Sequence, residues 1–395
     1  MSSTATPAGY SAERFVAPAE QTFKLPDGSS VNSVDTEGVI TITSGNSVVA
    51  FSPQERVVRV SPYGIVNEDR AVSEAVLLIS STTPVTARDL WVSIYALWLR
   101  RNEEDVAPVV IDETLFNGIE LQNYLTHTGL GYVPDASDPT TLLLSRPAFW
   151  QSAGAPPGMS WLRDPIPSPL LAPTPSLFPY VQSFTRGPHV LTTHPLRPPK
   201  PVPGSVIYSR YINCLGELLT FTHIDASNPV HFEAYTRWQN SDRVNVGWRE
   251  RGDDEHHRTY LKDRLADPHI MGFIVSWNGE AAGYGEISWV KEDPMGTYVG
   301  GLGDYDQGTH LLVGEERFRG RQRFTATMTS MKHMCLLREP RTEVVVGEPR
   351  ADLPIIPRLI AYLPQEFNRE FELPHKRAVY FVLRRERFFQ AAMLY

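Results

Sequence analysis

An aspartate and a histidine, Asp306 and His310, stand four residues apart around Gly308, where the chain enters a predicted strand. An imidazole can take up a proton near neutral pH, and a carboxylate can hydrogen-bond the group that loses it. The spacing therefore favours a catalytic pair for proton transfer. The alternative is structural: Asp306 would cap the turn, and His310 would be a hydrogen-bonded histidine of the core.

A basic loop follows the same strand and leads into an amphipathic helix predicted at 324–337. Free backbone N–H groups at a helix N-terminus, positive side chains and a glycine that permits close approach are features that bind a pyrophosphate. The loop therefore predicts a site for a phosphate-bearing cosubstrate, although it would also suit a solvated surface. The residues that could contact the anion are Arg317, Arg319, Gly320, Arg321 and Gln322.

Metal and serine-hydrolase chemistry find less support. Asp304, Asp306 and His310 are not accompanied by a further histidine or carboxylate at ligand spacing, so no metal site is predicted. The run 253–257 is better explained by acidic residues at a helix N-terminus than by a metal cluster. No Gly-x-Ser-x-Gly motif occurs in the sequence, which argues against a hydrolase with that nucleophile turn.

The elements that must position these residues form a predicted α/β domain over 205–395. Its hairpin is the clearest of them, because Asn278-Gly279 between two apolar runs tolerates the positive φ of a tight turn. Strands are predicted at 207–212, 218–223, 270–277, 282–290, 309–314, 343–346 and 378–383, and helices at 230–239, 256–265, 324–337 and 355–363.

Two other regions precede this domain. Residues 1–150 predict a smaller α/β domain with an unpatterned start up to about residue 30, and its role as scaffold, lid or dimer surface stays open. A degenerate second copy of the C-terminal fold is one interpretation of it. Residues 151–204 carry fourteen of the 33 prolines, a density that disfavours helices and sheet ladders and indicates an irregular connector.

The composition narrows the class of protein further. A net charge of −8 argues against nucleic-acid binding, which needs a concentrated basic surface. No apolar run approaches the roughly 20 residues that span a bilayer, and no leader-like start is present, so we expect a soluble, cytoplasmic protein without a membrane partner. Cys214 and Cys335 lie in apolar contexts, typical of reduced thiols.

Several collinear blocks carry a resemblance to a known family. A loop of the form Arg/Gln-x-x-Gly-x-Gly/Ala after a strand marks the GNAT superfamily of acyltransferases, and Arg317, Gly320 and Gln322 occupy its positions, with Gln322 where a small residue is usual. Within that superfamily the chain resembles the siderophore-biosynthesis N-acyltransferases, which include aerobactin-type hydroxylysine acetyltransferases and fungal hydroxyornithine transacylases. The matching blocks lie at 238–244, 283–293, 304–314, 340–342, 347–352 and 371–377.

The resemblance implies a C-terminal GNAT domain that binds acyl-CoA and needs no metal. It implies that Asp306 and His310 are catalytic. Glu286 would pair with the α-ammonium of an N-hydroxylated amino acid, although the strand period places Glu286 and Trp289 on opposite faces. The other implied acceptor residues are Trp289, Trp238, Asn240 and Lys376, and the other implied CoA residues are Leu312, Val313, Arg317, Arg319, Gly320, Arg321, Gln322 and Arg350.

The expected reaction is acyl transfer from acyl-CoA to the hydroxylated side-chain nitrogen of hydroxyornithine or hydroxylysine, which forms a hydroxamate. A hydroxylamine is largely neutral at physiological pH, so the demand for a strong base is low. Acylation of an ordinary amine and a non-catalytic acyl-CoA-binding scaffold remain alternatives. The acyl group, a monomeric or homodimeric state and contacts with other siderophore-assembly enzymes stay open.

Overall fold

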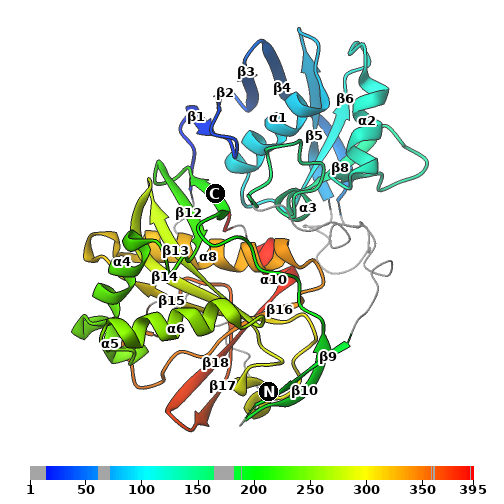
Figure 1. Cartoon of the computed structure of the whole chain (residues 1–395). Helices are drawn as coiled ribbons and strands as arrows, with labels where there is room; N and C mark the ends of the chain where they lie inside the picture. Colours follow the sequence, from blue (N-terminus) through cyan, green and yellow to red (C-terminus); the bar gives the residue numbers. More distant parts are fainter. Residues whose placement is uncertain are drawn as a thin grey trace. The chain divides into compact units, whose positions relative to one another are not determined.

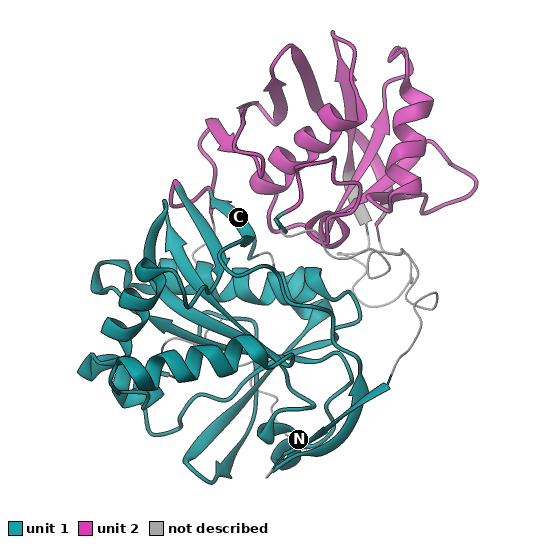
Figure 2. Cartoon of the chain, in the orientation of Figure 1, with its two compact units in different colours: residues 1–12, 161–212, 217–394 teal, residues 13–160, 213–216, 395 magenta. Residues whose placement is uncertain are grey.

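The structure, a computed structural model, describes residues 15–60, 72–163, 182–187, 189–356, 358, 361–391 and 393–395. Two compact units make up this part of the chain (Figure 2). The N-terminal unit extends to Ser160 and includes residues 213–216 and Tyr395, and the C-terminal unit contains residues 161–212 and 217–394. No helix in the described part is both long and apolar enough to cross a membrane.

The N-terminal unit is a mixed sheet covered by helices. Its elements are β1 (Glu20–Lys24), β2 (Ser30–Thr36), β3 (Val39–Ser44), β4 (Ser47–Arg59), β5 (Val72–Ser81), α1 (Ala87–Arg100), β6 (Val106–Ile111), α2 (Gly118–His127), β7 (Gly131–Tyr132), β8 (Thr141–Ser145) and α3 (Arg146–Trp150). Helix α1 begins with a capping box in which Thr86 and Asp89 bond each other's backbone N–H groups. Its residues from Leu90 to Leu99 are all buried, so α1 forms the centre of this unit's core.

The C-terminal unit contains a second eight-stranded sheet and a separate two-stranded ribbon (Figure 1). Its elements are β9 (Gln182–Arg186), β10 (Leu191–Pro195), β11 (Val206–Ile212), β12 (Glu217–His223), α4 (Pro229–Gln239), α5 (Asp242–Trp248), α6 (Asp254–Ala266), β13 (Ile270–Trp277), β14 (Glu280–Trp289), α7 (Pro294–Val299), β15 (Gln307–Val313), η3 (Glu316–Phe318), α8 (Arg321–Arg338), β16 (Val344–Gly347), β17 (Glu366–Leu373), β18 (Lys376–Arg384) and α10 (Arg385–Gln390).

The centre of this second sheet is buried on both faces. Every residue of β13 is buried, and the predicted hairpin to β14 is confirmed, with φ of 49° at Asn278 and 83° at Gly279. The ring of Tyr284 on β14 packs against α4 and α6, whereas a Cβ on the next residue, Gly285, would lie 3.3 Å from Met331 Cε of α8. Successive residues of β14 therefore face different helices.

The two sheets share one topology. In the N-terminal unit the strand order is β1-β2-β3-β4-β5-β6-β8-β7, and in the C-terminal unit it is β11-β12-β13-β14-β15-β16-β18-β17. In each unit the first five strands pair antiparallel in sequence, the fifth and sixth pair in parallel around a crossover helix (α1 or α8), and the last two return antiparallel. The N-terminal unit thus has the strand pattern of a second copy of the C-terminal fold.

Some segments differ from the sequence-based expectation. Strands β1 and β2 begin inside the stretch expected to be unpatterned up to residue 30, and its first fourteen residues lie outside the described part. The described residues of the expected connector, 151–204, belong to the two units: β9 and β10 pair with each other, and His194 and Arg197 are buried. Prolines at ribbon and strand ends leave enough N–H groups for this pairing. The helix predicted at 355–363 lies partly outside the described residues.

Candidate active site

The imidazole of His310 is bound by a glutamate that follows the neighbouring parallel strand. Glu348 comes directly after β16, and its Oε1 accepts a hydrogen bond from His310 Nε2 at 2.8 Å. Lys376, at the start of β18, forms an ion pair with the same carboxylate and donates to the Glu348 carbonyl at 2.8 Å. Lys376 therefore neutralises Glu348 from within the protein, and the expected acceptor contact of Lys376 would have to compete with this pair.

The pair shifts the proton affinities of both partners. Burial lowers the pKa of His310, but the hydrogen bond to Glu348 and the charges of Glu348 and Glu286 outweigh it, so the net shift is upward. Burial raises the pKa of Glu348, but the His310 bond and the charges of His310 and Lys376 outweigh it and bring the pKa to about 2. Glu348 is thus a fixed negative charge, and His310 is the member that exchanges a proton.

A second buried carboxylate lies across the strand pair. The register of β14 and β15 places Glu286 directly opposite His310. Glu286 is only 3% exposed, and its Oε1 accepts hydrogen bonds of 2.9 Å from the hydroxyls of Tyr260 and Tyr284, with Arg264 Nε at 3.6 Å. The Glu286 carboxylate is therefore already bonded within the protein, and the expected substrate ammonium would have to compete with these bonds. The charge of Glu286 contributes to the raised pKa of His310.

Asp306 does not join His310 in the described contacts. Its Oδ2 accepts the N–H of Gly303 at 2.7 Å, and its Oδ1 accepts the N–H of Val344 at 3.1 Å. Its carboxylate thus ties the turn before β15 to the start of β16. The expected pair of Asp306 and His310 does not form, because Asp306 precedes β15 and its carboxylate accepts from two backbone N–H groups, whereas His310 lies within the strand and binds Glu348.

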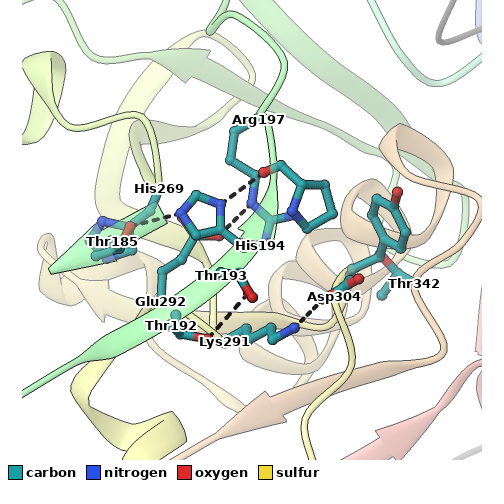
Figure 3. Close-up of polar contacts among 12 residues, drawn as sticks. Thr185, Thr192, Thr193, His194, Arg197, His269, Lys291, Glu292, Asp304 and Thr342 are labelled. Carbon is teal, nitrogen blue, oxygen red and sulfur yellow. Dashed lines mark hydrogen bonds and ion pairs between the residues drawn. The ribbon is translucent and has the colours of Figure 1, made fainter. Parts of the chain in front are cut away.

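Trp289 lies three residues from Glu286 on β14, so the strand period places the two side chains on opposite faces. The guanidinium of Arg197 lies 4.5 Å from the centre of the Trp289 ring, and its Nε donates to Glu292 Oε1 at 2.5 Å. His194 Nδ1 approaches the same oxygen at 3.1 Å, and Figure 3 shows His194, Arg197 and Glu292 together. These buried groups fasten the segment after β10 to the end of β14, so Trp289 serves this junction.

Two other expected acceptor residues form hydrogen bonds to neighbouring loops. Trp238 donates from Nε1 to Glu315 Oε1 at 2.8 Å, and a Cβ on Gly314 would lie 2.2 Å from its ring. The amide of Asn240 both donates to and accepts from the backbone of Gly252, at 2.9 and 3.1 Å. Trp238 therefore shapes the loop after β15, and Asn240 shapes the loop before α6.

The loop between β15 and α8 keeps the features expected of an anion site. Gly320 has a φ of 137° and no side chain, so the first N–H groups of α8 have no side-chain cap. Arg317 pairs with Glu280 at 2.6 Å, and Arg319 lies 3.8 Å from Glu316. Arg321 lies over the ring of Tyr362, and Gln322 is exposed. These are exposed, movable charges that suit a polyphosphate.

An open strand edge leads from this loop to His310. Strand β15 pairs with β16 only at Gln307 and Gly308, so the edge of residues 309–313 that faces away from β14 has no neighbouring strand in the described part of the chain. Leu312 and Val313 lie on this stretch. An amide-bearing chain could add there by backbone hydrogen bonds, as an extra strand would. Arg350 is not on this edge: it lies two residues after Glu348 and forms an ion pair with Asp352.

The N-terminal unit repeats this topology without the opening. Only Ser80 and Ser81 of β5 follow its last pair with β6, and Thr86 and Asp89 cap the N-terminus of α1 with a hydroxyl and a carboxylate. A capped terminus with an acidic residue in its first turn disfavours an anion. Among the described residues of either unit, no group of three His, Cys, Asp or Glu side chains is arranged to hold a metal ion.

We expect one acyl-CoA to bind per chain, because, of the two crossover helices α1 and α8, α8 has the N-terminus without a side-chain cap beside an open edge. Isothermal titration should give a stoichiometry near one. Arg319→Glu, which reverses a half-exposed charge in the loop, should weaken this binding by about tenfold or more. A stoichiometry of two would contradict the expectation that the N-terminal unit binds no acyl-CoA.

Comparison with known proteins gives a consistent family. Residues 228–373 match the family described as Acetyltransferase (GNAT) domain. The chain is 61% identical to acyltransferase ato1 of Omphalotus olearius over 99% of this chain and 100% of the relative, and 54% identical to acyltransferase fer5 of Mycosarcoma maydis over 86% and 78%. It is 41% identical to hydroxyornithine transacylase SID3 of Ajellomyces capsulatus over 63% and 58%.

These matches run through the segments that build the opening. The family match begins at the start of α4, contains His310, the loop before α8 and Glu348, and ends with β17. The identity to the first relative extends over both units. The chain is therefore an acyl-CoA-dependent N-acyltransferase of the GNAT superfamily and belongs to the siderophore-biosynthesis acyltransferase family that its sequence blocks resemble.

Proposed function

We propose that the acceptor is N5-hydroxyornithine, or the closely similar N6-hydroxylysine, and that the product is a hydroxamate. The observation that carries this proposal is the pair of His310 and Glu348 beside the open edge of β15. An imidazole remains a weak base even when a neighbouring carboxylate raises its pKa. It suits a nucleophile that is neutral at physiological pH, and a relative at 41% identity is named a hydroxyornithine transacylase.

The proposed reaction is direct attack in a ternary complex. The hydroxylamine nitrogen forms a bond to the thioester carbon of acyl-CoA, and the carbon–sulfur bond breaks as the tetrahedral intermediate collapses. His310 takes the proton that the nitrogen loses and delivers it to the departing thiolate, so that CoA leaves as a thiol. Glu348 holds the imidazole through Nε2 and stabilises its charged form during the transfer.

The remaining site residues have supporting tasks in this proposal. The uncapped start of α8 and Arg317, Arg319 and Arg321 would hold the pyrophosphate of CoA, and the edge containing Leu312 and Val313 would hold its amide-bearing arm. Glu286 would add a buried negative charge that favours the protonated imidazole. We keep Asp306 as the residue that fixes the turn into β15.

We expect rapid CoA release with N5-hydroxyornithine or N6-hydroxylysine and at most about 1% of that rate with ornithine or lysine at pH 7.5. An ammonium with a pKa near 10.4 is neutral in only about one molecule in a thousand at that pH, whereas a hydroxylamine is mostly neutral. The assay follows thiol release with acetyl-CoA and with longer acyl-CoAs. Comparable rates with plain amines would reassign the protein as a general amine acyltransferase, and binding of acyl-CoA without turnover would favour a scaffold.

A further inference from the structure

The C-terminal end of α5 carries an arginine in a backbone conformation that favours glycine. Arg249 caps the helix with φ of 59° and ψ of 32°, and its N–H donates to the Asn245 carbonyl at 3.0 Å. Glycine adopts this left-handed conformation readily, whereas a residue with a Cβ loses about 1 kcal/mol or more in it. The conformation by itself gives no reason for an arginine, so its side chain requires another explanation.

The residue before Arg249 anchors this helix end beside the reacting histidine. The indole of Trp248 packs edge-on against the ring of Tyr284 at 5.8 Å and against the ring of His310 at 6.5 Å. On the other side, a Cβ built on Gly247 would lie 3.9 Å from Leu353, in the segment that follows Glu348. Arg249 therefore directly follows Trp248, which packs beside His310, so the backbone of Arg249 is held near the His310 site.

The other basic side chains around this position are committed to carboxylates. Arg350 binds Asp352 through two hydrogen bonds of 2.9 and 2.5 Å, Lys376 is paired with Glu348, and Arg377 pairs with Glu370 at 2.6 Å. Each of these three ion pairs has a formal charge close to zero.

Arg249 is different from these neighbours. Among the residues that the structure describes, no carboxylate lies within ion-pair distance of its guanidinium. It is exposed, yet close enough to the Asp352 carboxylate and the His375 ring to affect their titration, which places its charge at the same opening. Among the described basic residues around this position, Arg249 thus has a charge that is available to a ligand.

We propose that Arg249 binds the α-carboxylate of the amino acid acceptor. The proposal rests on the proposed function and names the group that selects amino acids from other hydroxylamines. In N5-hydroxyornithine the reacting nitrogen and the carboxylate carbon are separated by five bonds, about 6 Å in an extended chain. The ring of Trp248, the residue before Arg249, lies 6.5 Å from the His310 ring, so an acceptor of that length with its nitrogen at His310 extends past Trp248 toward Arg249.

Guanidinium and carboxylate can form two parallel hydrogen bonds, which fix direction as well as affinity. When Arg249 holds the α-carboxylate of the acceptor, the side chain of the acceptor must be long enough to bring its nitrogen to His310. The site would then distinguish chain lengths by the fit of the acceptor between two fixed points rather than by a closed pocket. Hydroxylated diamines, which have no carboxylate, should bind weakly to the wild-type protein.

The test compares Arg249→Gly with the wild type on two acceptors. Glycine suits the left-handed cap, so this variant removes the side chain without a loss of folding. With acetyl-CoA, we expect the KM for N5-hydroxyornithine to rise about 10- to 100-fold, the range for a lost charged hydrogen bond. The KM for N-hydroxy-1,4-diaminobutane, which is the same chain without its carboxylate, should change less than about threefold.

Arg377→Ala is the matched control, because it removes an exposed arginine that already has an acidic partner, and both KM values should stay unchanged. An equal loss for both acceptors, or no loss for either, would overturn the role of Arg249. A raised KM for acetyl-CoA would also overturn it, since Arg249 would then bind the donor. If the wild type acylates only plain amines, the proposed acceptor fails, and the same comparison of ornithine with 1,4-diaminobutane still tests Arg249.

Discussion

Replacing His310 with alanine is expected to lower kcat by about 10²- to 10⁴-fold while the affinity for acyl-CoA stays within about twofold. The imidazole of His310 lies beside the open edge of β15, and its raised pKa allows it to exchange a proton near neutral pH. Its loss removes proton transfer but leaves the start of α8 and the arginine loop intact. Single-turnover kinetics and titration calorimetry of the same variant separate the two effects.

His256→Ala serves as the control for this experiment. His256 is half-exposed near the start of α6 and pairs with Glu250 at 3.1 Å, so its removal deletes a histidine from the same unit without touching the opening. Its kcat should equal that of the wild type. A His310→Ala variant with an unchanged kcat would contradict proton transfer by His310 and would return this residue to a structural role in the sheet.

The sequence singled out His310, the proposed catalytic histidine, but not the glutamate that binds it. His310 stands in a compact block with Gly308 and the strand after it, so local pattern and family resemblance both point to it. Glu348 lies 38 residues away and meets His310 only because β15 and β16 run parallel from neighbouring starts. The block 347–352 was visible in the sequence, but Arg350 was the residue chosen from it, since only the fold shows which side chain turns toward His310.

Sequence pattern also does not separate residues that hold loops in place from residues that bind a ligand. Trp238 and Asn240 belong to a block shared with the family, yet their polar atoms hold Glu315 and Gly252. A buried indole N–H or amide needs a partner whether or not substrate is near, so shared polar residues include those that shape loops. Hydrogen bonds to main-chain groups of other segments are not legible from residue type or spacing.

The repeated topology shows what periodicity can and cannot reveal. Alternating strands and the crossover helix were predicted in both units, and the suggestion of a second copy agrees with the shared strand order. The functional difference depends on short details: two residues rather than five after the last parallel pair, and a capping box rather than a glycine at the helix start. These details decide whether a strand edge and helix terminus are free for a ligand.

Replacing Glu348 with glutamine is expected to lower both the stability of the C-terminal unit and the pKa of His310. Glutamine can still accept from Nε2, but Lys376 is then a buried charge without a counter-ion, and breaking such a pair costs about 3–5 kcal/mol. The unfolding midpoint in urea measures this loss. Adding Lys376→Met to Glu348→Gln should recover most of the stability, because the unpaired ammonium is gone, without restoring the pKa of His310.

The pH dependence of kcat/KM shows in which direction Glu348 shifts the pKa of His310. If neutral His310 accepts the proton, kcat/KM rises with pH through the pKa of His310, which Glu348 holds above its ordinary value of 6.5. In Glu348→Gln this rise should move to lower pH, and its plateau should fall because the charged imidazole loses its counter-ion. An unchanged profile would mean that His310 and Glu348 do not share the proton that limits the reaction.

The pH dependence of wild-type stability should reflect the ionisation of Glu348 and His310. The pKa of Glu348 is lowered from 4.5 to about 2, so its contribution is present above pH 4.5 and is lost as the pH falls toward 2. The pKa of His310 is raised, so its contribution is complete below pH 6.5 and is lost as the pH rises through the folded-state value. The pair is therefore most stabilising between pH 4.5 and 6.5, below the pH at which a neutral imidazole is abundant. Catalysis and stability draw on opposite protonation states of His310. The double variant Glu348→Gln with Lys376→Met should lose this pH dependence of stability, and its kcat/KM should still rise at lower pH than that of the wild type.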